Sequence, residues 1–266
     1  MKNLILLTYI LFCFKAYGID PKKEYITTPS KIGLKYVSER IKVNDLEINT
    51  WLTYSKFNNK LSKKHKTIFL VYGDYGNMSY FINYIDFFSN LGYNVITFDY
   101  RGFGESSNFE INKNQLYYNE FADDFNVVLN YYQSKIGVKN LTIMSLSMGS
   151  ITTVIGLVKN NKSCIYDLIF EGAVYDDYEI LQRLKEIKGK VISSPNNKDE
   201  LKKKWNYLKS NIIIVVGEED LITNKEDANI IVSKGENRKF IILQGGHLSS
   251  LHNKSNINIF SKLFKK

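Results

Sequence analysis

Apolar residues along this chain gather in short continuous runs, separated by longer stretches with helical spacing. The runs IFLVYG, from Ile68, and IIIVVG, from Ile212, show the first pattern best. Such runs are typical of strands that are buried on both faces of a sheet. The pattern predicts strands at Leu34–Val43, Glu47–Tyr54, Thr67–Tyr72, Tyr93–Asp99, Asn140–Leu146, Leu168–Glu171, Ile212–Gly217 and Lys239–Leu243.

The stretches between these strands repeat their apolar residues with a helical period, as Phe121, Phe125, Val128, Leu129 and Tyr132 do. Strands that alternate with helices form parallel βαβ units, and two successive strands at the start predict an antiparallel beginning. We therefore expect one α/β domain, with a mostly parallel sheet of about eight strands flanked by helices and a small cap or none. Helices are predicted at Met78–Leu91, Tyr117–Ile136, Met148–Lys159, Asp177–Lys188, Asp199–Lys209, Glu226–Lys234 and from Asn256 onwards.

The N-terminus has the pattern of a secretory signal peptide. Lys2 precedes an apolar run from Leu4 to Phe14, which is shorter than the roughly 20 residues that span a membrane. Ala16-Tyr17-Gly18 places small residues where signal peptidase reads them. We expect residues 1–18 to be removed after Gly18 and the protein to be secreted or periplasmic. Residues 19–31 then form a polar leader, and residues 32–266 form the domain.

The chain is basic, with a formal net charge of +9. A basic surface favours anionic partners such as lipid headgroups, and with them peripheral association with a membrane surface. Its lysine clusters lie in polar stretches that are typical of solvated surface. No aromatic-basic motif of nucleic-acid binding is present, and the sequence does not indicate an oligomeric state.

The strongest candidate for chemistry is Ser147, at the end of an apolar strand and the start of a helix. A serine at the apex of such a sharp turn needs small residues two positions before and two after it, because larger ones collide. Ser145 and Gly149 meet this need. The spacing predicts a nucleophilic serine in a strained turn.

A serine nucleophile needs a histidine base, which a carboxylate orients. After such a turn the acid and then the histidine follow along the chain. Of His65, His247 and His252, we favour His247, which follows a strand through two glycines, over His252. For the acid we favour Asp220 directly after a strand, with Glu219 and Glu171 as alternatives.

Acyl transfer also needs hydrogen-bond donors for the oxyanion, each contributing about 2.7–4 kcal/mol. We expect the backbone N–H of Met148, at a helix N-terminus, to be one of them. The backbone N–H of Asp74, in the loop after Val71, is expected to be the other. The alternative is that this loop is only a turn between a strand and a helix.

Four anchors together resemble the α/β-hydrolase fold from about Leu34 to the C-terminus. They are the loop YGDYGN from Tyr72, the turn DYRGFGES from Asp99, the turn at Ser147, and Asp220 with His247. The second is similar to the structural Asp-x-Arg-Gly-x-Gly-x-Ser turn of that family. The branch it resembles contains depalmitoylase-like and monoglyceride-lipase-like enzymes, which implies hydrolysis of small-molecule or lipid acyl esters or thioesters without cofactor or metal.

The sequence departs from this family in the oxyanion loop, where Tyr72 replaces the usual His and Asp74 a frequent Asn. Because the donor at Asp74 is the backbone, we expect its side chain to turn away. Two alternatives to an esterase remain. One is a serine peptidase or acyltransferase with the same three residues, and the other is a catalytically silent binding protein.

Overall fold

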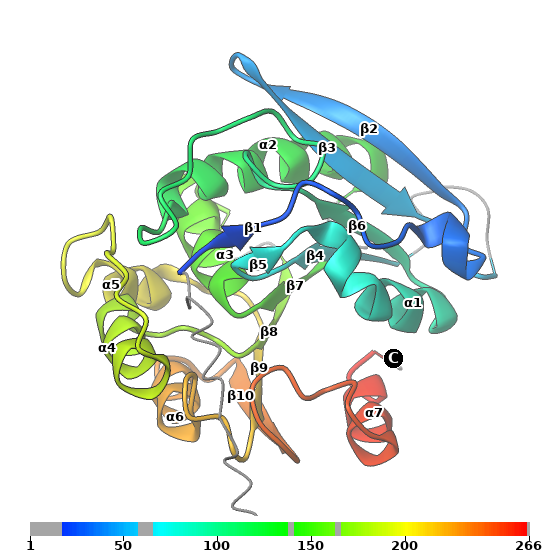
Figure 1. Ribbon diagram of the computed structural model, residues 1–266. Coiled ribbons are helices and arrows are strands. Elements are labelled where there is room, and N and C mark those ends of the chain that lie inside the picture. The colour runs from blue at the N-terminus through cyan, green and yellow to red at the C-terminus, as the bar shows by residue number, and fades with distance from the viewer. Residues whose placement is uncertain (1–17, 58–65, 138–140, 163–165, 265–266) are drawn as a thin grey trace, which may run out of the picture.

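A computed structural model describes residues 18–57, 66–137, 141–162 and 166–264 (Figure 1). Its centre is an eight-stranded sheet with the strand order β10-β9-β8-β7-β4-β6-β3-β2. The sheet is parallel except where β3 pairs antiparallel with β2 and β6. This confirms the predicted fold class. The strands are β2 (Tyr36–Val43), β3 (Leu46–Thr53), β4 (Thr67–Val71), β6 (Asn94–Phe98), β7 (Leu141–Leu146), β8 (Asp167–Glu171), β9 (Ile212–Gly217) and β10 (Arg238–Leu243).

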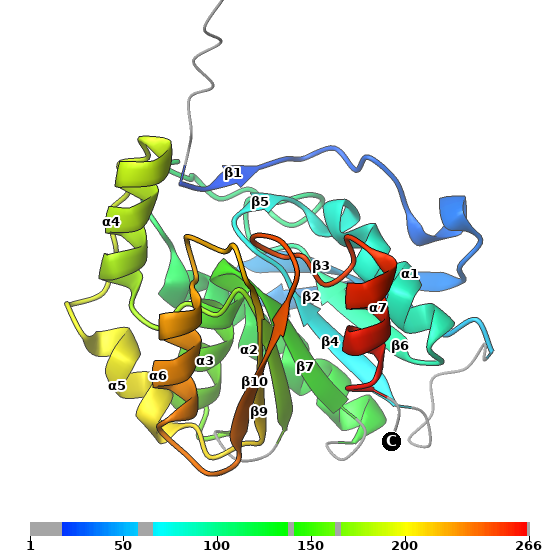
Figure 2. The same ribbon diagram turned by 90° about the horizontal axis from the view of Figure 1, so that it is seen from below.

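Helices cover both faces of the sheet (Figure 2). On one face lie α1 and α7, and on the other lie α2, α3 and α6. The apolar runs predicted these layers because β4 and β6 are buried along their whole length. The helices are α1 (Ile82–Asn90), α2 (Tyr118–Ile136), α3 (Met148–Lys159), α4 (Asp177–Lys188), α5 (Glu200–Tyr207), α6 (Lys225–Val232) and α7 (Lys254–Ser261).

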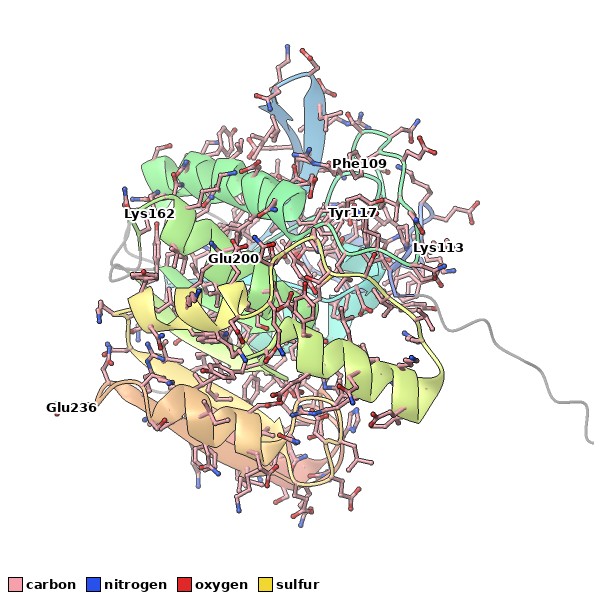
Figure 3. All side chains as sticks on the ribbon, turned by 90° about the vertical axis from the view of Figure 1, so that its left-hand side faces the viewer. Phe109, Lys113, Tyr117, Lys162, Glu200 and Glu236 are labelled. Atoms are coloured by element: carbon pink, nitrogen blue, oxygen red, sulfur yellow. The ribbon has the colours of Figure 1, made fainter. Side chains whose placement is uncertain are left out.

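The segment between β8 and β9 holds α4 and α5. Helix α4 lies at the carboxyl edge of the sheet, whereas α5 packs beside α3 with Trp205 against Phe170 of β8. The segment that carries Lys113 and Tyr117, both labelled in Figure 3, lies beside the chain that follows α4. Here the N–H of Leu116 donates to the carbonyl oxygen of Ser193 at 3.1 Å. The N–H of Ser193 donates to the carbonyl oxygen of Asn114 at 2.8 Å. The two segments together enclose one side of the carboxyl edge of the sheet.

The polar leader packs on the domain, which the sequence pattern did not predict. The two-residue strand β1 (Asp20–Pro21) pairs in parallel with β5 (Tyr75–Gly76), and Ile19 is fully buried. Two 3₁₀ helices, η1 (Pro29–Ile32) and η2 (Met78–Phe81), were also not predicted as such. Apart from Gly18, the expected signal peptide lies outside the described residues, so its removal and secretion stay predictions. Within the described ranges, no helix is long and apolar enough to cross a bilayer.

Candidate active site

Ser147 lies at the tight turn between β7 and α3, as the sequence predicted. Its φ of 52° and ψ of −123° are strained for a residue with a side chain. Gly149 explains the need for a small residue nearby, because a Cβ there would lie 2.4 Å from the carbonyl oxygen of Val71. The first helical turn can therefore pack directly on β4. This geometry presents the Ser147 hydroxyl at the carboxyl edge of the sheet.

Ser145, which stands where a glycine is usual, is accommodated without a clash. Its side chain is fully buried, and its Oγ lies 2.7 Å from Oγ1 of Thr153 on α3. The N–H of Ser147 donates to the carbonyl of Glu171 on the neighbouring strand at 2.9 Å. This hydrogen bond ties the backbone of Ser147 to β8.

His247 reaches Ser147 from the loop that follows β10. Its Nε2 lies 2.9 Å from the Ser147 Oγ. Gly172, with a φ of +65°, lies against the imidazole, since a Cβ there would come within 2.6 Å of Cε1. The side chain of His247 is 25% exposed, so this imidazole is accessible from the site. A base in this position can take the serine proton.

Asp220 lies on the other side of the same ring. Its Oδ2 is 2.8 Å from Nδ1 of His247, and its Oδ1 accepts the N–H groups of Ile222 (2.9 Å) and Thr223 (3.0 Å). Burial alone would raise the pKa of Asp220, but the hydrogen bond and charge of His247, with Thr223, outweigh it and hold the pKa below its ordinary value. An ionised Asp220 keeps the proton on Nδ1, which leaves Nε2 free to act as a base.

The rival residues lie elsewhere. His252 and Glu219 are exposed, and no hydrogen bond joins either side chain to Ser147 or His247 in the described part of the chain. His65 lies outside the described residues. Thr223 was missed by the sequence analysis, although its hydroxyl donates to Oδ2 of Asp220 at 2.6 Å. Thr223 has no sequence signal of its own beyond its place three residues after Asp220.

Glu171, the other alternative for the acid, does not form a hydrogen bond with His247 in the described part of the chain. Its buried carboxylate accepts the N–H of Ser250 (2.8 Å), the Ser250 hydroxyl (2.7 Å) and the Tyr84 hydroxyl (2.8 Å). Ser250 belongs to the loop that carries His247, and Tyr84 to α1. Burial raises the pKa of Glu171, although the three hydrogen bonds act to lower it. Glu171 therefore anchors the histidine loop and does not touch the imidazole through a hydrogen bond.

The two expected oxyanion donors flank Ser147. Met148 is the first residue of α3, so its N–H has no partner within the helix. Asp74 follows β4, and its carbonyl accepts the N–H of Asp20 in the leader at 2.9 Å. Both residues line one cavity with Ser147 and His247. The positions suit two backbone donors beside the hydroxyl.

Asp74 of the oxyanion loop is partly buried and lines the cavity. That its side chain turns away from the oxyanion stays a prediction. Burial raises the pKa of its carboxyl group, although the charges of Lys190, His247 and Lys188 act to lower it. Tyr72, in contrast, is 1% exposed and donates its hydroxyl to Oδ1 of Asp99 at 3.1 Å. Its replacement of the usual histidine is therefore accommodated in the core, away from the reacting groups.

The turn at Asp99 is a structural anchor. The Asp99 carboxylate accepts the hydroxyls of Tyr25 (2.5 Å) and Tyr72 and the N–H of Met78 (2.8 Å). Burial raises its pKa to about 6 although these donors favour the ionised form. Arg101 of the same turn forms an ion pair with the buried Asp124 at 2.7 Å. The turn thereby ties the leader, the oxyanion loop and α2 together.

The cavity beside Ser147 has a volume of about 100 Å³. It lies between the start of α3, α4 and the loop after α4, and it is lined by Gly18, Asp74, Leu116, Tyr118, Ser147, Met148, Ile151, Val174, Ile180, Leu181, Leu184, Lys188, Lys190, Ile192, Ile222, Thr223 and His247. A larger hollow of about 470 Å³ lies at the opposite edge of the sheet, away from Ser147. In the described ranges, no group of His, Cys, Asp or Glu is placed to hold a metal ion.

Comparisons with known proteins agree with this architecture. Residues 62–211 match the family model described as serine aminopeptidase, S33. An esterase from Pyrococcus furiosus is similar in structure, with a TM-score of 0.70 and 16% identity over 94% of this chain and 96% of that one. An esterase from Exiguobacterium antarcticum has a TM-score of 0.64 and 17% identity, over 85% of this chain and 99% of that one. A predicted CIB-like hydrolase from Thermoplasma acidophilum has a TM-score of 0.58 and 20% identity, over 87% of this chain and 98% of that one. No curated protein matches the sequence. At these identities the structural likeness shows a common fold.

Proposed function

Because the chain belongs to the serine aminopeptidase (S33) family of α/β hydrolases, we propose that it hydrolyses carboxylic ester or thioester bonds of acyl substrates. The observation that carries this proposal is the pair of contacts from Ser147 Oγ to His247 Nε2 (2.9 Å) and from His247 Nδ1 to Asp220 Oδ2 (2.8 Å). Three groups in this order are what a hydroxyl needs to become a nucleophile.

The reaction proceeds in two halves. His247 takes the proton of Ser147 as the oxygen attacks the acyl carbonyl, and Asp220 stabilises the imidazolium that forms. The N–H groups of Met148 and Asp74 stabilise the oxyanion. His247 then gives its proton to the leaving alcohol or thiol. Water, activated by the same imidazole, releases the acid from the acyl-enzyme and restores the serine.

The test is Ser147→Ala assayed with short p-nitrophenyl esters. We expect turnover to fall at least ~10⁴-fold with the thermal unfolding midpoint unchanged, because the variant lacks the attacking oxygen and keeps its surroundings. Ser134→Ala, an exposed serine of α2, is the matched control and should leave the rate unchanged. Unaltered activity of Ser147→Ala would exclude the nucleophile.

A fluorophosphonate probe separates this proposal from a silent scaffold. Labelling of the wild-type protein and not of Ser147→Ala supports an enzyme, whereas absence of labelling on folded wild-type protein supports a binding protein. The burial of Tyr72 in the core argues for the enzyme, because that departure from the family does not alter the reacting groups.

The family description favours one second candidate, an aminopeptidase. The same three residues can attack an amide, and the Asp74 carboxyl group in the cavity can bind a substrate ammonium group. Comparison of aminoacyl p-nitroanilides with p-nitrophenyl esters decides between the two. A kcat/KM for the anilides that equals or exceeds that for the esters supports the peptidase.

A further inference from the structure

The cavity beside Ser147 has mostly apolar walls. Ile151 of α3, Ile180 and Leu184 of α4, and Ile192 of the following loop all line it. Of these, Ile151 and Ile180 are buried, and Leu184 and Ile192 are partly buried. The walls begin at the nucleophile, so a chain attached to the reacting carbonyl lies along them. They suit hydrocarbon better than a polar group.

The size of the cavity restricts what that chain is. Its volume is about 100 Å³. Sites for drug-sized ligands are typically about 300–1,000 Å³. A cavity this far below that range suits a short acyl chain better than a fatty acyl chain.

Two side chains line the part of the apolar wall next to α4. Leu184 lies on the last turns of α4, and Ile192 lies in the loop that follows it. Next to them Lys188 is exposed and Lys190 is half-buried, and both also line the cavity. A longer chain would meet these ammonium groups and water, so its further carbons would not be buried.

We propose that the substrates are esters or thioesters of short acyl chains, of up to about four carbons, and that Leu184 and Ile192 set this limit. The inference rests on the proposed function. It narrows the substrate class within it, since the resemblance of the sequence to depalmitoylase-like and monoglyceride-lipase-like enzymes would by itself imply long chains.

The first test is kcat/KM of the full chain for p-nitrophenyl acetate, butyrate and octanoate. Each methylene buried in the cavity should raise kcat/KM about fourfold, which corresponds to ~0.8 kcal/mol. We therefore expect butyrate, which has two more methylenes, to exceed acetate about 15-fold, and octanoate to fall at least about tenfold below butyrate. A value that keeps rising to octanoate refutes the inference and leaves the proposed function intact. Hydrolysis of none of the esters refutes both.

The second test enlarges the cavity. Leu184→Ala and Ile192→Ala should each raise the octanoate-to-butyrate ratio of kcat/KM at least about tenfold. The control is Ile187→Ala, on the same helix and 48% exposed but outside the cavity lining, which should leave the ratio unchanged. Because a ratio measured on one sample does not depend on the folded fraction, loss of stability cannot mimic the result. An unchanged ratio in both cavity variants overturns the assignment of Leu184 and Ile192.

Discussion

Asp99 and Asp220 each follow a strand of the central sheet, and each is at most 4% exposed. Asp99 receives hydrogen bonds from two tyrosines and one backbone N–H, and burial raises its pKa to about 6. Asp220 faces His247, and its pKa is lowered despite burial. Burial and hydrogen bonding are common to both carboxylates. The partner of Asp220 is an imidazole within hydrogen-bond distance of the Ser147 hydroxyl, whereas the partners of Asp99 are two tyrosines and a backbone N–H in the core. In the proposed function, this difference separates a site for chemistry from an anchor of the fold.

Replacing each aspartate with asparagine should give the largest difference between the two sites. Asp220→Asn should lower kcat by ~10³–10⁴-fold with little change in stability, because an amide favours the wrong tautomer of His247. Asp99→Asn should leave kcat per folded molecule within about threefold but lower the free energy of unfolding by ~1–3 kcal/mol, because an amide NH₂ cannot accept from the surrounding donors. Steady-state kinetics and urea unfolding measure the two effects. Inactivation of stably folded Asp99→Asn would break the distinction.

The two carboxylates should also give stability opposite slopes with pH. The folded pKa of Asp99 is about 6, above its ordinary value of 3.8, so the folded state binds the extra proton between these values. Ionised Asp99 therefore costs stability at neutral pH, and the cost is relieved as pH falls from about 6 to 4. Relative to Asp99→Asn, the wild-type protein should gain up to ~3 kcal/mol over this range.

Asp220 should behave in the reverse way. Its folded pKa is lowered, so its contribution is present above the unfolded pKa of about 3.8 and is lost as pH falls through the folded value. The difference in unfolding free energy between wild type and Asp220→Asn should thus shrink on acidification. Urea unfolding at pH 7, 5 and 4 measures both differences, and parallel slopes for the two variants would contradict the assigned pKa directions.

Glu171 shares one property with each aspartate, burial with Asp99 and proximity to His247 with Asp220, and it therefore sharpens the comparison. It is buried like Asp99 but holds the loop of His247 through Ser250. Glu171→Gln should lower kcat about tenfold with KM nearly unchanged, because a small displacement of the base slows proton transfer and leaves the cavity intact. Glu219→Gln, an exposed neighbour of Asp220, is the control. An equal fall in kcat for the control, or an effect confined to KM, would remove Glu171 from this role.

The sheet and the three central side chains could be predicted from the sequence because each has a local signal. Strands such as Ile212–Gly217 are continuous apolar runs, and Ser147, Asp220 and His247 each follow such a run at the same edge. The pairing of β1 with β5 could not be predicted, because two-residue strands have no periodicity. The contacts of Glu171 with Ser250 and Tyr84 span 79 and 87 residues and depend on packing that no local pattern records.

The position of Gly18 in the cavity wall has a practical consequence for how the protein is produced. The expected cleavage after Gly18 removes this residue from the wall, so a purification tag or fusion partner joined directly to Ile19 would take the place of Gly18 at the cavity and obstruct it. The carboxyl-terminal side is safer, because Phe264 packs against Phe88 and Tyr93 and lines the hollow at the opposite edge of the sheet from Ser147. Tags for kinetic work and tethers for immobilisation therefore belong at the carboxyl terminus.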